Sequence, residues 1–322
     1  MVINLSFGSV DIPFKDILQI FLGNDTVKES WHYIIINYRL PKAITAMLVG
    51  SGLSICGLLM QTLFRNPLAG PFVLGISSGA SLGVALLILG LSIFSINIIG
   101  LSITNIGLVI AASIGAFIVL SAVILVSKKV RNTMSILIIG LMFGSFTAAI
   151  ISVLAYFSSA ENLQQYVFWT FGSLGNLGWN EIAILGTLYL ISLLILTTII
   201  KPLNSLLLGE NYAISLGVNI KKTRNTILII TGMLTGVITA FSGPIAFIGL
   251  AVPHLTKLII KTANHKILLP SVAIFGAIIM LISDTIAQLP TIVYTLPINA
   301  VTSLFGAPIV IWLLVRKRKI YY

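Results

Sequence analysis

The chain contains 322 residues, of which 57% are hydrophobic and only 8% charged, and its formal net charge is +11. Soluble domains carry about 25% charged residues, so this supply cannot cover a water-exposed surface and excludes an ordinary soluble protein. The basic excess does not favour nucleic-acid binding, because the Lys and Arg residues flank apolar runs and no basic soluble segment is present. The composition therefore predicts an integral membrane protein.

Apolar stretches long enough to cross about 30 Å of hydrocarbon recur from residue 43 to residue 315. Every backbone polar group must be bonded within the membrane, and long runs without alternation favour helices over a β-barrel. The sequence therefore predicts an all-α, polytopic transmembrane helical bundle. Its nine expected spans cover residues 43–64, 72–90, 106–127, 134–157, 182–200, 226–242, 245–260, 268–287 and 298–315.

The positions of the basic residues predict the orientation of this bundle. They cluster within residues 128–131, 201–224, 257–266 and 316–319. Basic residues concentrate on the cytoplasmic side of a membrane, so we place these groups and the C-terminus in the cytoplasm and residues 1–42 outside. With this orientation 15 of the 19 Lys and Arg residues face inward. The whole chain, residues 1–322, is then one transmembrane domain of the plasma (inner) membrane.

The outer segment, residues 1–42, needs a means of crossing the membrane. Residues 1–14 contain no apolar run long enough for a signal peptide or a span. We expect a further helix upstream of this segment, and the alternative is translocation of the N-terminus driven by the span 43–64.

Small residues and prolines recur in a pattern along the chain. The small residues are Gly50, Ser51, Gly52, Ser54 and Gly57, then Gly75, Ser77, Ser78, Gly79 and Gly83. Small side chains let membrane helices approach closely, so we expect most of them to mediate packing, while a minority could line a pathway. Proline-containing breaks at residues 65–71 and 242–244 indicate either a repeated half, as in many transporters, or simple tight turns.

Enzyme chemistry finds little support in the sequence. No glycine is followed by lysine, so the phosphate-binding G-x-x-x-x-G-K-[ST] loop is absent from the sequence. Three histidines far apart and one cysteine do not form a zinc-binding pattern. The sequence therefore predicts a protein that is neither an ATPase nor a metal-dependent enzyme, and that needs no cofactor.

Two of the ionisable residues within the expected spans, Asp284 and His254, could carry chemistry. Asp284 is close to the outer end of the span 268–287, where we expect bonds to neighbouring serine or backbone donors rather than ion transport. His254 follows Pro253, and we expect its imidazole to cap carbonyls that the proline frees. A ligand role for His254 is the alternative.

A polar cytoplasmic loop, residues 201–224, separates two of the spans. Residues 212–216 predict a short helix that ends at Gly217. Taken alone, this loop is either a docking site for an intracellular partner or a solvated connector.

Several motifs occur in one order along nearly the whole chain. They include Arg39-Leu40-Pro41-Lys42, Arg65-Asn66-Pro67-Leu68-Ala69-Gly70-Pro71, Leu74-Gly75-Ile76-Ser77-Ser78-Gly79-Ala80, Gly209-Glu210-Asn211-Tyr212-Ala213 with Leu216-Gly217, Gly243-Pro244-Ile245-Ala246-Phe247-Ile248-Gly249-Leu250, Pro253-His254, and Gly306-Ala307-Pro308. In this combination the chain resembles the permeases of iron-siderophore, haem and cobalamin ABC importers, often called the FecCD family.

The resemblance implies a ten-helix subunit that pairs with itself or a close relative, a homodimer being the first expectation, so that the solute passes between two copies. It also implies a cytoplasmic ABC ATPase subunit, an extracytoplasmic solute-binding protein and surrounding membrane lipid as partners. The implied site residues are Gly209, Glu210, Tyr212, Ala213, Leu216 and Gly217 for ATPase coupling, Arg39, Lys42 and Gln288 for docking of the binding protein, and Asn132, Thr133 and Met134 for an inner gate.

The chain departs from the family pattern in three places. The family's first helix normally precedes a segment like residues 5–12, Gln288 stands where an outer arginine is common, and residues 297–299 replace a more usual Pro-x-Gly. The resulting expectation is an importer permease without its own ATPase site. An ion-coupled secondary transporter is the main alternative, and a membrane enzyme acting on lipid or peptide is the second. Ferric siderophore is the first substrate expectation, with haem and cobalamin open.

Overall fold

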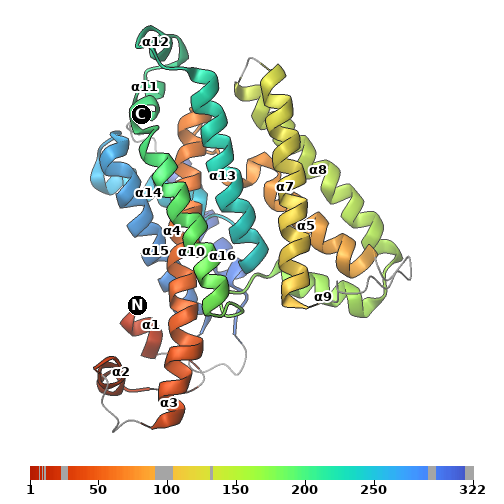
Figure 1. Ribbon diagram of the computed structural model, residues 1–322, viewed down its shortest axis with the longest axis vertical. Helices are drawn as coiled ribbons and strands as arrows, with labels where there is room; N and C mark the ends of the chain where they lie inside the picture. Colours follow the sequence, from red (N-terminus) through yellow and green to blue (C-terminus); the bar gives the residue numbers. More distant parts are fainter. Residues whose placement is uncertain are drawn as a thin grey trace.

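The structure is a computed structural model that describes residues 1–6, 8, 10, 12–22, 28–90, 104–130, 133–288 and 295–315. Within these residues the chain is helical and forms no strand (Figure 1). The helices are α1 (Val2–Ser6), α2 (Phe14–Phe21), α3 (Glu29–Ile34), the π-helix η1 (Ile35–Arg39), α4 (Leu40–Phe64), the 3₁₀ turn η2 (Pro71–Leu74), α5 (Ile76–Ala85), the π-helix η3 (Leu86–Gly90), α7 (Asn105–Lys129), α8 (Thr133–Phe157), α9 (Ala160–Thr170), α10 (Trp179–Thr197), α11 (Ile200–Leu207), α12 (Glu210–Ser215), α13 (Ile220–Ser242), α14 (Ile248–Ile260), α15 (His265–Ala287) and α16 (Ile298–Val315).

Each of the nine expected spans coincides with a helix or with a series of consecutive helices, which confirms the helical bundle. Six helical stretches within the described residues are both long and apolar enough to cross a membrane. The other three expected spans correspond to shorter apolar helices at 76–90, 248–260 and 298–312. The span count therefore differs modestly from the expected nine: helix breaks shorten the spans that contain α5 and α14, whereas α16 covers the whole expected range 298–315.

Backbone conformation explains where these breaks fall. Gly75 has φ 70° and separates η2 from α5, so the helix expected from residue 72 begins at Ile76. Phe247 has φ 65°, which delays the start of α14 from the expected residue 245 to Ile248. The expected span 43–64 has the opposite error, since helix continues back through η1 and α3 to Glu29.

The stretch from Glu29 to Phe64 contains 36 residues, about 54 Å of helix at 1.5 Å per residue. It is longer than the roughly 30 Å hydrocarbon core, so about half of its length extends beyond the membrane. Figure 1 shows α3 and α2 at the end of the molecule opposite α12.

Helix α4 is the centre of the larger group of helices and packs against α10, α13, α14 and α15. A Cβ added to Gly57 would overlap the carbonyl oxygen of Gly249 in α14, and one added to Gly50 would overlap that of Gly276 in α15. Glycine is therefore needed at these two crossings, and the predicted packing role of the small residues is confirmed here.

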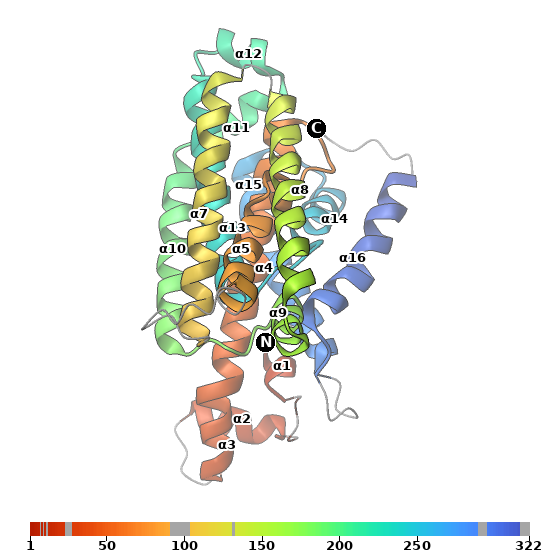
Figure 2. The same ribbon diagram turned by 90° about the vertical axis from the view of Figure 1, so that its right-hand side faces the viewer.

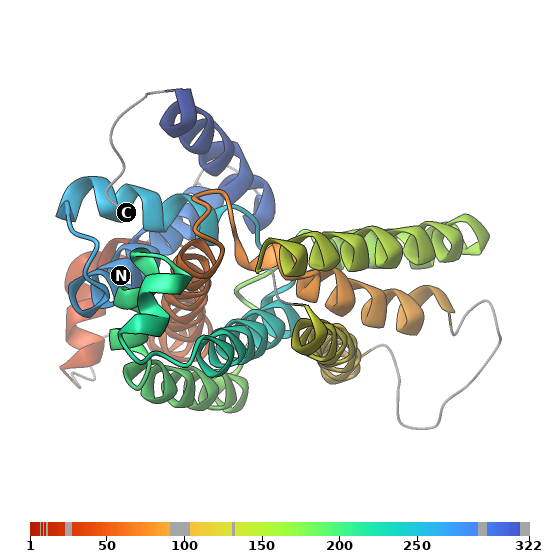
Figure 3. The same ribbon diagram turned by 90° about the horizontal axis from the view of Figure 1, so that it is seen from above.

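Helices α5, α7 and α8 form a second group beside the first, which Figure 3 shows from above. Gly79 and Gly83 of α5 contact the backbone of α7 around Gly115, so these two helices cross closely. Helix α13 connects the groups by packing against both α4 and α7.

Candidate coupling and docking sites

Helices α11 and α12 lie at one end of the bundle, beside the end of α7 and the start of α13 (Figures 1 and 2). The N-terminal helices α1, α2 and α3 lie at the other end. The residues predicted for ATPase coupling and those predicted for docking of a binding protein are therefore separated by the length of the bundle.

Glycines at both ends of α12 determine its shape. Gly209 precedes the helix with φ 109°, and Gly217 follows it with φ 80°, both values that favour glycine. At the C-terminal end the amide of Val218 donates to the carbonyl of Ala213 at 3.0 Å, and that of Gly217 donates to Ile214 at 2.9 Å. This is the Schellman arrangement, which ends α12 sharply and turns the chain into α13.

Helix α12 has a buried side and an exposed side. Ala213 is fully buried, and α12 packs on α11. Tyr212, Ile214 and Leu216 are 56%, 59% and 56% exposed, respectively. Tyr212 and Leu216 were predicted from sequence, whereas Ile214 was not, although apolar residues in a polar loop are the signal that marks all three. All three apolar side chains are exposed at the tip of the bundle, with Tyr212 and Leu216 on one side of the helix and Ile214 on another.

Glu210 faces its own chain. The Thr133 hydroxyl, at the start of α8, donates a 2.6 Å hydrogen bond to Glu210 Oε1. Thr133 is buried and the neighbouring Met134 is 46% exposed, while Asn132, the third predicted gate residue, lies outside the described residues. The structure therefore joins one predicted coupling residue to one predicted gate residue.

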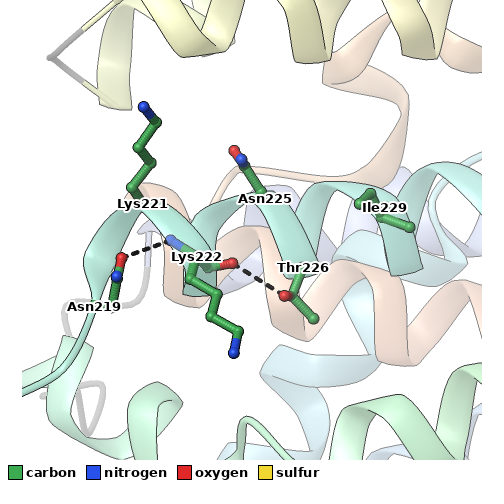
Figure 4. Close-up of a pocket in the computed structure, with 6 residues that line it drawn as sticks. All are labelled: Asn219, Lys221, Lys222, Asn225, Thr226 and Ile229. Atoms are coloured by element: carbon green, nitrogen blue, oxygen red, sulfur yellow. Dashed lines mark hydrogen bonds between the residues drawn. The ribbon is translucent and has the colours of Figure 1, made fainter.

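An open groove runs along the first three turns of α13. It is lined by Asn219, Lys221, Lys222, Asn225, Thr226 and Ile229 (Figure 4). The side chains of Lys221 and Lys222 point to different sides of the helix. Exposed lysines at the end of an apolar helix are typical of the cytoplasmic membrane boundary.

The outer-end residues Lys42 and Gln288 converge on one buried carboxylate. Lys42 Nζ lies 3.1 Å from Asp284 Oδ1, and this is the one ion pair found among the described residues. Gln288 Nε2 donates to Asp284 Oδ2 at 2.5 Å and Asn4 Nδ2 donates to the same oxygen at 2.9 Å. The expected serine and backbone donors for Asp284 were wrong, because the partners come from α1, α4 and the end of α15.

Arg39, the third predicted docking residue, is 8% exposed. Its Nη1 donates to the carbonyls of Leu5 at 2.6 Å and Ser6 at 3.0 Å, and its Nη2 donates to the carbonyl of Val10. The guanidinium therefore holds the N-terminal segment against the start of α4. Its described contacts are structural, and docking at this residue stays a prediction.

The sequence matches the FecCD transport family over residues 1–316. The chain belongs to this family. The hemin transport system permease protein HmuU of Yersinia pestis is 34% identical over 324 residues, covering 99% of this chain and 94% of the relative. The vitamin B12 import system permease protein BtuC of Citrobacter koseri is 36% identical over 282 residues, covering 87% and 82%.

A solved structure agrees with this assignment of the FecCD chain. It is an inward-facing conformation of a metal-chelate type ABC transporter, with a TM-score of 0.83 and 30% identity, covering 98% of this chain and 94% of that one. The FecCD chain is thus an integral membrane protein and a transmembrane permease of an ABC importer.

Two histidines of this FecCD permease have structural partners. His254 Nε2 is 2.7 Å from the carbonyl oxygen of Pro67, so it caps a carbonyl of the loop after α4 rather than one freed by Pro253. The expected partner was therefore wrong, although the imidazole does bind a backbone carbonyl. His265 was missed as a structural residue: its ring lies between Thr62 of α4 and Asn204 of α11, each at 2.8 Å.

Proposed function

We propose that this permease imports an iron chelate or a similar cofactor, with a ferric siderophore as the first candidate and haem and cobalamin as the others. The named relatives are permeases for hemin and vitamin B12, and both cargoes are large metal chelates. The solute would pass between two copies of the chain, a homodimer in the first instance. Selectivity would then rest mostly with a solute-binding protein.

The exposed surface of α12 is the observation that carries the proposal. Three large apolar side chains, Tyr212, Ile214 and Leu216, are exposed at the tip of the bundle on a helix anchored by buried Ala213. Apolar patches presented in this way mark protein interaction sites. We propose that this surface docks the cytoplasmic ATPase subunit, and that the permease itself breaks no covalent bond.

The opposite end would receive the solute-binding protein. The orientation of the chain in the membrane is inferred from its basic residues. Lys128 and Lys129 end α7, and Lys221 and Lys222 lie at the start of α13, all at the same end of the bundle as α12. The positive-inside rule then places α12 and the C-terminus in the cytoplasm and α1–α3 outside. Lys42 and Gln288 would support docking by fixing the shape of the outer surface around Asp284, and Arg39 would do so through the N-terminal segment.

Purification of the tagged full-length chain from its native membrane tests the proposal. We expect an ABC ATPase subunit to copurify and to be lost when Tyr212→Lys and Leu216→Lys are combined. Leu22→Lys is the matched control, since Leu22 is an exposed apolar residue at the other end of the molecule. Haemin, cyanocobalamin and a ferric hydroxamate, added in turn together with the cognate solute-binding protein, identify the cargo by stimulation of ATP hydrolysis.

Recovery of a well-folded native chain without any ATPase would overturn the proposal. Uptake that persists after ATP depletion and follows an ion gradient would then establish a secondary transporter. Equal ATPase recovery with the native chain and with the double variant would leave the importer function standing but refute docking at α12.

A further inference from the structure

We infer that Glu210 and Arg224 are positioning residues that tie both arms of the α7–α8 hairpin to the coupling segment, so that displacement of α12 moves the inner end of α8. This inference rests on the proposed function, because it assumes that an ATPase subunit acts on α12. It assigns to Glu210 a role inside the permease rather than contact with the ATPase.

The first tie joins α12 to α8. Glu210 is the first residue of α12 and Thr133 the first of α8, and 77 positions of sequence separate them. Their 2.6 Å contact is in the range of a charge-assisted O–H···O⁻ hydrogen bond, which is roughly twice as strong as a neutral one. Thr133 is 8% exposed, so water competes little for its hydroxyl.

The second tie joins α13 to α7. Arg224 Nη2 donates a 3.0 Å hydrogen bond to the carbonyl of Ser127, in the last turn of α7. Arg224 is 6% exposed, although it lies only four residues into α13. Lys221 and Lys222, three and two residues earlier on the same helix, are instead exposed in the groove of Figure 4. Arg224 is thus distinguished from its basic neighbours by burial and by a specific partner on another helix.

Helix electrostatics favours both ties in the same sense. The C-terminal end of a helix carries partial negative charge and its N-terminal end partial positive charge. Cationic Arg224 binds at the C-terminal end of α7, and anionic Glu210 binds at the N-terminal end of α8. The two charges therefore match the two helix ends that they contact, and exchanging them would make both contacts unfavourable.

The two contacts connect the α7–α8 hairpin to the α12–α13 hairpin, one contact for each pair of facing helix ends. Helices α7 and α8 are joined by residues 130–132, and α12 and α13 are joined by residues 216–219. Only 17% of the most apolar window of α8 is buried, and near its inner end the helix packs on η2 through buried Ile136 and Gly140. Thr133 lies at the free end of α8, one to two turns before this contact. A displacement of α12 then carries the start of α8 with it.

Labelling of an introduced cysteine in the intact complex tests this connection. Ile138→Cys, one turn into α8 and 56% exposed as isoleucine, reports on the inner end of α8, while native Cys56 is buried and gives the background. In inside-out vesicles with bound ATPase, ATP with vanadate should change the maleimide labelling rate about fivefold or more, the lower end of allosteric couplings. Thr133→Val should abolish that change while ATPase copurification and ATP hydrolysis continue.

Three variants separate transmission from general damage. Thr133→Ser keeps the hydroxyl and should restore the nucleotide-dependent change, and Glu210→Gln, which keeps an acceptor without charge, should give an intermediate change. Thr226→Val is the matched control, because among the described residues the Thr226 hydroxyl donates to the Lys222 carbonyl of its own helix, and it should behave as the parent.

The inference is overturned if Thr133→Val shows the parent's response, or if Thr226→Val loses it equally. Absence of a copurifying ATPase from the parent itself would overturn the proposed function instead, and with it the signal to be transmitted.

Discussion

Removal of the Lys42 charge should destabilise the permease more than removal of its partner's charge. Asp284 is 2% exposed in its side chain, whereas Lys42 is 21% exposed. In Lys42→Met the carboxylate stays buried, with only the amide donors of Asn4 and Gln288 as described partners. In Asp284→Asn the lysine can turn its ammonium toward solvent, and an amide oxygen still accepts from Asn4.

The magnitudes follow from this difference in burial. Leaving a buried charge without its counter-ion lowers the free energy of unfolding by roughly 3–5 kcal/mol. Because the amide donors of Asn4 and Gln288 still bind the carboxylate, we expect Lys42→Met to cost about 3 kcal/mol, the lower end of this range. Asp284→Asn removes an ion pair with a lysine that keeps contact with solvent, which costs about 1 kcal/mol. The double variant Lys42→Met with Asp284→Asn should resemble the Asp284→Asn variant, because no buried charge is left.

The native cysteine provides the assay. Cys56 is the single cysteine of the chain and has no exposed surface, so a fluorogenic maleimide reacts with it only on unfolding in detergent. At roughly 2–4 °C per kcal/mol, the melting temperature of Lys42→Met should lie about 4–8 °C below that of Asp284→Asn. If Asp284→Asn is equally or more destabilised, or the double variant is worse than Lys42→Met, the assignment of Asp284 as the buried, dependent partner is wrong.

Two further variants test the packing of the bundle and of its N-terminal segment. Gly57→Ala should destabilise by about 3 kcal/mol or more, since overpacking typically costs 1–3 kcal/mol and an added Cβ overlaps the Gly249 carbonyl. Gly186→Ala, where the nearest atom to such a Cβ is 4.0 Å away, is the control in the same melting assay and should be near neutral. Arg39→Met should speed tryptic cleavage at exposed Lys15 about tenfold or more, because each lost charged hydrogen bond is worth roughly 1.5–3 kcal/mol. Equal cleavage rates in Arg39→Met and the native chain would show that the guanidinium does not hold this segment.

The sequence predicted the helices well because a membrane leaves the backbone few alternatives. Long apolar runs must form helices there, so each expected range coincides with one. The helix over residues 29–42 and α9 were missed, because their polar residues obscure the apolar signal on which the prediction depended. The left-handed conformation of Phe247 was also unpredictable, since a bulky residue rarely adopts it.

The side-chain partners were far harder to predict than the helices. The α12 surface follows from apolar residues within a polar loop, a local signal. The contact of Glu210 with Thr133 spans 77 positions and that of Asn4 with Asp284 spans 280. No spacing or periodicity encodes such distant pairs, because they depend on how helices cross in three dimensions.

The outer basic residues show how structure changes the meaning of a charge count. Four Lys and Arg residues were expected on the outer side, against the positive-inside trend. Arg39 binds backbone carbonyls, Lys42 pairs with Asp284, and Lys28 lies 4.8 Å from the centre of the Trp31 ring. Only basic residues without such partners should influence the orientation of the chain in the membrane. The four outer basic residues therefore contradict the positive-inside rule less than their number implies. The same reasoning applies to a test of docking by the binding protein. Replacing Arg39 would perturb the N-terminal segment that it holds, whereas Lys15 is exposed and can be replaced without that effect.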